Sequence, residues 1–340
     1  MRISRAPHRT FARAVTPLLA AGLLLSACGG DDDPEPKADD GASAAPSEPD
    51  HWPLTGVALP DGESAAKSHP VYVVKVENTD GGAPQVGLSQ SDLVVEELVE
   101  GNLTRLAAFY YENLPREVEA VRSMRPSDAG IVAPVDGTIV TSGAAGFTKE
   151  TLDEAGVSYI EEGADGFSRD DSRPAPYNVI ADLKTISKSA EGEDARPDDY
   201  FTWSDAEKFP AGKKAKNFTA DFGGHASQWS YDGKGYVLEN GHMPEDDAFT
   251  PDTVAVLKVR TSLAPYKDPG GADVPISHFE GKGNAWVFHD GRMVKATWEK
   301  SAEDAPVSFS LADGTELAVP VGKVWLELLP KNAGQVSLGQ

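Results

Sequence analysis

The sequence has almost no cysteine. Cys28 is the only one among 340 residues, which excludes a disulfide within the chain and any cysteine-based zinc site. The seven histidines are scattered, and the His-Glu-x-x-His motif of many zinc enzymes does not occur. We therefore expect no metal and no cofactor.

Positive charge is scarce as well. The chain carries 31 Lys and Arg against 54 Asp and Glu, a formal net charge of -23. Proteins that bind nucleic acid use clustered Lys and Arg to neutralise phosphates. DNA and RNA are therefore not expected partners.

The apolar run Leu18–Leu25 follows four arginines and is too short to span a bilayer, which is typical of an export signal. It ends in Leu25-Ser-Ala-Cys28, which resembles the lipidation site of bacterial lipoproteins. Residues 1–28 are thus predicted to be a lipoprotein signal peptide, with acyl chains such as palmitate on Cys28. The alternative is an ordinary signal peptide with an incidental cysteine.

Two acyl chains on Cys28 would give stable attachment to membrane lipid. No segment after Cys28 is apolar enough to cross a bilayer, so we expect a lipid-anchored protein on the extracytoplasmic face of the cell membrane. Residues 29–50 contain Asp, Glu, Pro, Ala and Ser and no large apolar residue. This composition predicts a disordered tether.

The length beyond the tether suggests two folded domains. Thr148 is expected to cap the start of a helix that Gly156 ends. A mixed α/β (α+β) domain with a central sheet is predicted for 51–200, from strand patterns at 71–76, 92–97, 103–111, 117–122 and 138–142 and helix patterns at 148–155 and 178–187.

The second half of the chain has a different sequence pattern. Asp-Gly pairs at 232–233, 290–291 and 313–314 lie between apolar flanks, which is a strong hairpin signal. A β-rich C-terminal domain is predicted for 215–332, with strands at 253–259, 285–288, 294–298 and 323–328.

Charged residues occur within and between the predicted strands from Ser91 to Pro126. Burying them is costly unless they form pairs or bind a ligand. Since side chains alternate along a strand, Glu96 and Glu97 should face opposite ways. The candidate ligand-binding residues of this stretch are Glu96, Glu97, Glu100, Arg105, Arg122, Ser123 and Arg125.

Two interpretations of this group remain open. Arginines placed close together need carboxylates or a bound anion. The group is either a cleft for an anion, phosphate or sugar, with Glu96 or Glu100 as acid, base or hydrogen-bonding group, or an internal ion-pair network that fixes the sheet.

A second polar group follows on a long loop, and loops often carry binding residues. The common explanation of such a group is a solvated run of charges. Its members are Arg169, Asp170, Asp171, Arg173 and Asn178, of which Arg169 and Asn178 are kept as candidates.

Several segments resemble the YerB-like lipoproteins, namely 87–105, Val121-Arg-Ser-Met-Arg-Pro126, Pro176-Tyr-Asn178, Gly281-Lys-Gly283 and 325–330. The resemblance implies an anchored protein with an N-terminal and a C-terminal domain, whose function is unknown. Tyr177 stands where the family usually has histidine, and Thr141 stands near a position often held by histidine. These departures argue against a mechanism that needs those imidazoles.

Two functional hypotheses follow. The first and favoured one is a non-catalytic binding or interaction module of the cell envelope, whose partner is a cell-wall glycan, an anionic ligand or an envelope protein. The second is a hydrolase or transferase that acts on cell-wall polymers or phosphate-linked precursors through the Arg/Glu group. Neither hypothesis assigns a catalytic residue.

Overall fold

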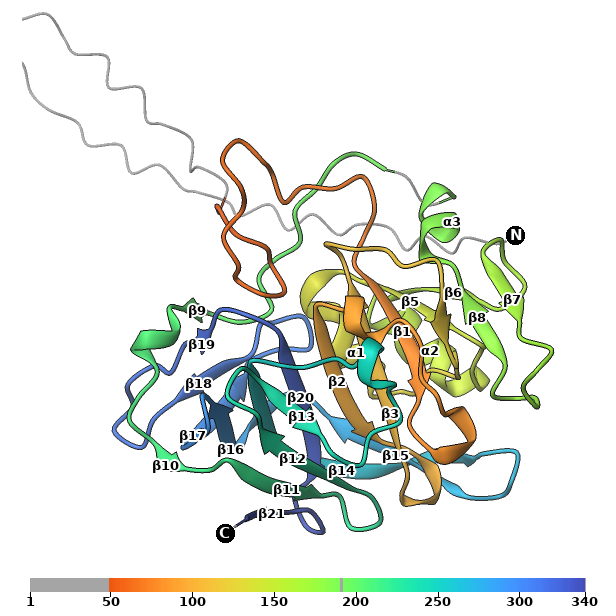
Figure 1. The fold of residues 1–340 in the computed structure, drawn as a ribbon. Coiled ribbons are helices and arrows are strands. Elements are labelled where there is room, and N and C mark those ends of the chain that lie inside the picture. Colours follow the sequence, from red (N-terminus) through yellow and green to blue (C-terminus); the bar gives the residue numbers. More distant parts are fainter. Residues whose placement is uncertain (1–48, 190–191, 340) are drawn as a thin grey trace, which may run out of the picture. The chain divides into compact units, whose positions relative to one another are not determined.

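The central sheet is built from strands that are buried on both faces. Every residue of β1 (Tyr72–Glu77), β2 (Leu93–Leu98) and β20 (Val324–Pro330) is buried, as expected of apolar runs covered on both sides. The computed structural model describes residues 49–189 and 192–339 (Figure 1). The predicted signal peptide with Cys28, and nearly all of the predicted tether at 29–50, lie outside these residues.

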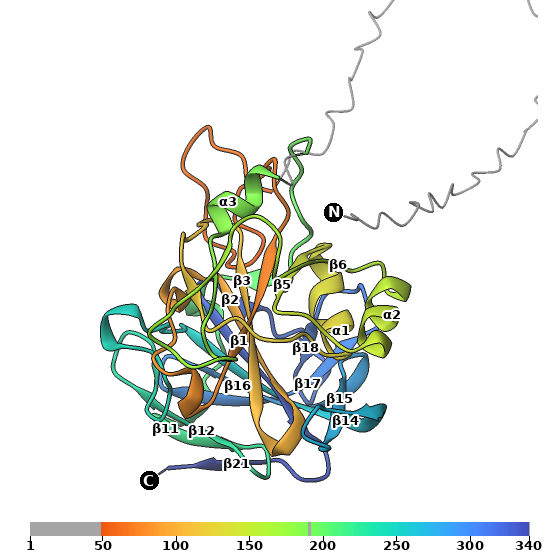
Figure 2. The same cartoon turned by 90° about the vertical axis from the view of Figure 1, so that its right-hand side faces the viewer.

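Twelve of the described strands form this mixed sheet, in the order β10-β17-β16-β14-β20-β2-β3-β1-β5-β6, with β15 beside β14 and β18 beside β17. β2, β3 and β1 lie side by side as antiparallel neighbours (Figure 2). The other strands of the sheet are β3 (Thr104–Tyr110), β5 (Thr138–Thr141), β6 (Ser158–Glu161), β10 (Lys213–Lys214), β14 (Thr253–Lys267), β15 (Asp273–His278), β16 (Gly281–His289), β17 (Arg292–Lys300) and β18 (Ser308–Ser310).

β20 connects the two halves of the chain. Its Val324 pairs in parallel with Leu93 of β2 on one side and with Thr253 of β14 on the other. The ranges 51–200 and 215–332 therefore contribute strands to one sheet, and the chain from Asp50 onward lies in one compact unit.

Shorter elements cover the sheet. A second sheet has the order β13-β12-β11-β21, a third has the order β4-β8-β7, and β9 pairs with β19. Their bounds are β4 (Val118–Glu119), β7 (Phe167–Arg169), β8 (Val179–Ala181), β9 (Trp203–Ser204), β11 (Asn217–Asp221), β12 (Ala226–Tyr231), β13 (Tyr236–Leu238), β19 (Val319–Pro320) and β21 (Gln335–Leu338), and the helices are α1 (Asp128–Val132), α2 (Gly146–Glu154) and α3 (Leu183–Lys188).

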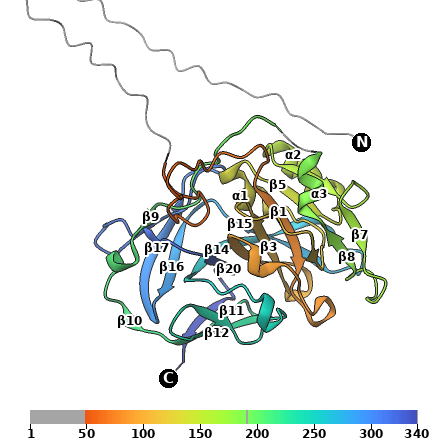
Figure 3. The ribbon, with the colours of Figure 1, turned by 45° about the horizontal axis from the view of Figure 1, so that its top comes forward.

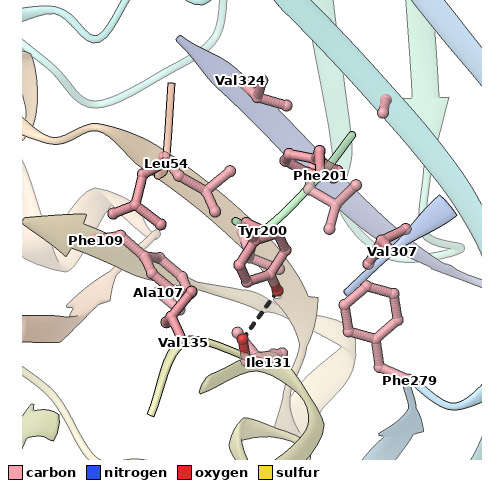
Figure 4. Close-up of a cluster of buried hydrophobic side chains, with 14 of the residues drawn as sticks. Leu54, Ala107, Phe109, Ile131, Val135, Tyr200, Phe201, Phe279, Val307 and Val324 are labelled. Atoms are coloured by element: carbon pink, nitrogen blue, oxygen red, sulfur yellow. Dashed lines mark hydrogen bonds between the residues drawn. The ribbon is translucent and has the colours of Figure 1, made fainter. Parts of the chain in front are cut away.

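Each face of the central sheet has its own apolar core. Figure 3 shows α1 and the pair β11–β12 on either side of β14 and β20. On the α1 side, Phe109 packs with Tyr200, whose hydroxyl donates to the carbonyl oxygen of Ile131 at 2.9 Å (Figure 4). On the β11–β12 side, Trp325 packs against Trp229.

Most of the strand predictions are confirmed. β1, β2, β3 and β5 lie within a residue or two of their predicted positions, and β14, β16, β17 and β20 contain or overlap theirs. Asp290-Gly291 forms a two-residue turn between β16 and β17, with φ of 49° and 66°. A two-residue hairpin with a type I′ turn requires positive φ at both central positions.

Other local predictions are wrong. The strand expected at 117–122 is reduced to β4, which pairs with β8 and not with β3. The helix expected at 178–187 is divided into β8 and α3. Ala145, not Thr148, is the N-cap of α2, and Thr148 lies within the helix, where its hydroxyl forms a 2.8 Å hydrogen bond with the Tyr266 hydroxyl. The predicted fold class agrees with the structure in its mixed central sheet, although strands outweigh the short helices in the described residues.

The place of β20 predicts how fragments behave. A fragment of residues 51–200 lacks β20, so that β2 becomes an edge with unpaired N–H and C=O groups. We expect this fragment not to fold as a soluble monomer, and co-expression with residues 201–340 to restore a folded complex. Size-exclusion chromatography and circular dichroism measure both. A monomeric 51–200 fragment with a cooperative melting transition would contradict the expectation.

Candidate functional site

Glu96 and Glu97 face opposite sides of the sheet, as the alternation of strand side chains predicts. Both are fully buried. Glu97 lies on the face of Lys75 and Arg105, and Glu96 lies on the face of Thr104 and Ser227. The structure therefore does not bring Glu96 into the group of arginines to which the sequence assigned it.

Glu97 is held in a buried triad with Lys75 and Asp128. The Lys75 Nζ donates to Glu97 Oε1 at 2.7 Å and to Asp128 Oδ1 at 2.6 Å, and none of the three side chains is exposed. Burial and the neighbouring Asp128 carboxylate raise the pKa of Glu97. The sequence analysis missed Lys75 and Asp128, although a lysine inside an apolar strand was a usable signal.

Three arginines meet two carboxylates at the start of β3. Arg122 Nε donates to Glu77 Oε2 at 2.6 Å. Arg125 forms a two-pronged pair with Glu100, in which Nε lies 2.8 Å from Oε2. Arg105 lies between them, with Nη2 at 3.9 Å from Glu77 and 3.8 Å from Glu100. These five residues are called the arginine cluster below.

The arginine cluster holds three guanidinium groups and two carboxylates. Burial and the nearby Arg125 and Arg122 lower the pKa of Arg105 to about 10, against the opposing effect of Glu77 and Glu100. Its Nη1 donates to the Ser123 carbonyl oxygen at 3.0 Å, but its Nε has no partner among the described residues. Although burial acts in the opposite direction, Arg125 and Arg105 hold the pKa of Glu100 below its usual value.

Tyr177 and Thr141 both lie beside Arg122, Tyr177 half-buried and Thr141 fully buried. The guanidinium of Arg122 lies 5.1 Å from the centre of the Tyr177 ring, and its Nη1 donates to the Pro176 carbonyl oxygen at 3.1 Å. The Thr141 hydroxyl donates to the Arg122 carbonyl oxygen at 3.0 Å. Ser123 Oγ lies 3.4 Å from Ser142 Oγ.

Arg169 and Asn178 form a separate pair. Arg169 donates to Asn178 Oδ1 at 2.7 Å and to Glu162 Oε1 at 2.7 Å. In the same loop region, Arg173 lies 3.3 Å from Glu119 and donates to the Pro84 carbonyl oxygen at 2.7 Å. These contacts hold the loop, and no hydrogen bond or ion pair within the described chain connects Arg169 with the arginine cluster.

On the opposite face, Glu96 lies beside a second buried carboxyl group, Glu327, across the β2–β20 pair. Glu96 accepts from Ser227 at 2.9 Å and lies 3.1 Å from His225 Nε2. Burial raises the pKa of Glu96, but His225, Thr104 and Ser227 outweigh it and leave the pKa lowered.

Glu327 is the member of this pair with the raised pKa. Burial and the neighbouring Glu96 raise its pKa well above the usual value, and Trp229 Nε1 donates to its Oε1 at 2.6 Å. The sequence analysis missed Glu327. The available signal was an acid between apolar neighbours in a predicted strand.

Chemically, the arginine cluster can bind an anion. Both of its carboxylates are engaged in ion pairs, which disfavours them as general acids or bases. In the part of the chain that the structure describes, no group of His, Cys, Asp and Glu has the arrangement of a metal site.

The comparisons agree with the fold and the sequence motifs. Residues 54–196 match the family described as the N-terminal domain of a protein of unknown function (DUF3048), and residues 218–326 match its C-terminal domain. This chain belongs to the YerB-like family.

YerB of Bacillus subtilis (strain 168), provisionally described as a lipoprotein, is 28% identical over 308 residues, which cover 85% of this chain and 89% of YerB. The crystal structure of the YerB protein from Bacillus subtilis has a TM-score of 0.69 at 21% identity and covers 84% of this chain and 99% of that one. The likeness fits a lipoprotein. No helix within residues 49–189 and 192–339 is both long and apolar enough to cross a membrane.

The buried triad predicts a large cost for removing its cation. Lys75→Met leaves Glu97 and Asp128 buried without a positive partner, which should destabilise the protein by about 3–5 kcal/mol. Lys149→Met is the matched control, because Lys149 pairs with Glu161 at 2.7 Å at the surface and should change stability by less than about 1 kcal/mol. Denaturant unfolding measures both variants, and equal effects would contradict the prediction.

The raised pKa of Glu327 predicts a pH dependence of stability. The folded protein holds a proton that the unfolded chain releases above a pH of about 4.5, so the free energy of unfolding should fall as pH rises from there towards the folded-state pKa. Glu327→Gln keeps the acceptor for Trp229 and should flatten this slope. Glu299→Gln, on an exposed residue of β17, should leave it unchanged. Denaturant unfolding across the pH range is the measurement, and an unaltered slope in Glu327→Gln would be the contrary result.

Proposed function

We propose that this lipoprotein is a binding module of the cell envelope, and that its arginine cluster holds an anionic group, a phosphate or a carboxylate, of an envelope ligand. One observation carries the proposal: three guanidinium groups lie together with only two carboxylates, in a chain whose net charge is -23. A bound anion would neutralise the remaining positive charge and supply acceptors for the unused donors.

Arg122 is the residue best placed to reach a ligand. Its side chain is 19% exposed, whereas that of Arg105 is 4% exposed. It is positioned on one side by Glu77 and on the other by the Tyr177 ring. A guanidinium fixed in this way loses little freedom when it binds an anion, which favours affinity.

Binding is favoured over catalysis by the contacts of the groups that could react. Glu77 and Glu100 are engaged by arginines. Ser123 Oγ has the Ser142 hydroxyl as its neighbour, and no histidine in the described part of the chain hydrogen-bonds to either serine. An activated serine would require a base within hydrogen-bond reach.

The proposal predicts the effect of replacing Arg122. With inorganic pyrophosphate as the probe, Arg122→Ala should weaken binding by about tenfold to a hundredfold, the usual effect of losing a hydrogen bond to a charged group. Arg122→Lys should fall between this variant and the wild type, since it keeps the charge without the planar fork. Calorimetric titration of the full-length protein at low salt measures the three affinities.

Arg116→Ala is the control, because this substitution removes the same charge from an exposed site. Arg116 lies 3.6 Å from Asp182. Its affinity for pyrophosphate should equal that of the wild type. Equal losses in Arg116→Ala and Arg122→Ala would show a non-specific charge effect and contradict the proposal. An Arg105→Ala variant with unchanged melting and unchanged pyrophosphate binding would contradict it as well.

A further inference from the structure

A hollow of about 490 Å³ lies beside the β16–β17 turn, within the size range of small-molecule sites. It lies at the other end of the sheet from the arginine cluster. His289 lines the hollow and lies in one row across the sheet with Thr253, Val324 and Leu93. This row is at the end of the sheet where β2 begins. The arginine cluster lies beyond the far end of β2, after Glu97.

His289 presents an acceptor that the protein does not use. Its Nδ1 lies 3.1 Å from the Asp252 carbonyl oxygen and 3.0 Å from Thr253 Oγ1. Because a carbonyl oxygen only accepts, Nδ1 carries the hydrogen, and Nε2 of the neutral ring is left as an acceptor. Burial lowers the pKa of His289, which keeps the ring neutral. Nε2 has no hydrogen-bond partner among the described residues.

Asp252 presents a second acceptor to the same hollow. Its Oδ2 accepts from the backbone N–H of Lys323 at 2.8 Å, which fixes the orientation of the carboxylate. Its Oδ1 makes no hydrogen bond within the described chain. His289 and Asp252 therefore offer two oriented acceptors, and both need donors from outside the chain.

Aromatic rings flank these acceptors. The Phe209 ring lies 5.3 Å from that of His289, between ring centres, and Tyr231 forms another part of the lining. The Tyr231 hydroxyl donates to Asp290 Oδ1 at 2.8 Å, and Arg292 lies 3.2 Å from Asp290 Oδ2. These contacts fix Tyr231 and engage both oxygens of Asp290.

The charges at the hollow nearly cancel. Glu207, Asp252 and Asp290 are opposed by Lys234 and Arg292. A strongly cationic ligand would meet Lys234 and Arg292, and a strongly anionic ligand would meet the three carboxylates. A ligand with several hydroxyl donors and an apolar face fits this lining better, because its hydroxyls satisfy the acceptors and its face packs on the aromatic rings.

We propose that this hollow binds a polyhydroxylated sugar ring, whose hydroxyl groups donate to His289 Nε2 and Asp252 Oδ1 while the ring packs against Phe209 and Tyr231. This site is independent of the arginine cluster. A glycan ligand of the envelope would then have two separate points of contact on one chain.

The test is a titration of the full-length protein with methyl glucopyranoside, glucuronate and methylammonium, followed through the backbone amide signal of Gly291. Saturable shifts with either sugar are expected, and the stronger of the two tells whether a neutral or an acidic sugar is preferred. The proposal would be overturned if methylammonium alone caused shifts, or if none of the three compounds caused any.

Asp252→Asn is the decisive variant. The amide oxygen of asparagine can still accept from Lys323, but its NH2 group places a donor where the sugar hydroxyl must donate. Sugar affinity should fall about tenfold, the effect of losing one hydrogen bond, while the melting temperature stays unchanged.

Two variants serve as controls. Asp246→Asn removes the same charge from an exposed residue outside the hollow, and Arg122→Ala alters the arginine cluster. Both should bind the sugar as the wild type does. If Asp252→Asn binds as tightly as Asp246→Asn, the proposed site is wrong, whatever the outcome at the arginine cluster.

Discussion

The pairing of β20 with both β2 and β14 is the constraint on which the rest of the structure depends. It joins residues more than two hundred positions apart into one sheet. Because β20 lies there, the end of β2 is held rigidly where the arginine cluster begins, and Glu327 is placed beside Glu96. The chain thus needs its last strands to complete a sheet that its first strands begin, and the entropy of closing such long loops must be overcome before the sheet forms.

The protein separates its buried charges by the two faces of this sheet. On one face, Lys75 pairs with both Glu97 and Asp128, and the arginine cluster follows at the strand ends. On the other, burial and the neighbouring Glu96 raise the pKa of Glu327, whereas His225 and the hydroxyl groups around Glu96 lower the pKa of Glu96. Neighbouring acids on one strand therefore have different electrostatic surroundings.

Local patterns predicted a large part of the fold. The apolar runs of β1 to β3 and the Asp290-Gly291 turn depend on near neighbours in sequence, which alternation and turn chemistry describe well. Alternation also assigned Glu96 and Glu97 to opposite faces. It cannot tell which strand is the neighbour, so the place of β20 and the partners Lys75 and Glu327 were missed. Arg105, Arg122 and Arg125 were found because their charges interrupt strand-like sequence.

The contact between Arg122 and the Tyr177 ring has a consequence for acidic surroundings. A histidine in that position would gain a positive charge in mild acid and add to the attraction for an anion. The tyrosine ring instead offers its electron-rich face to the guanidinium. A change from tyrosine to histidine at position 177 would therefore make the proposed anion site respond to acidification of its surroundings.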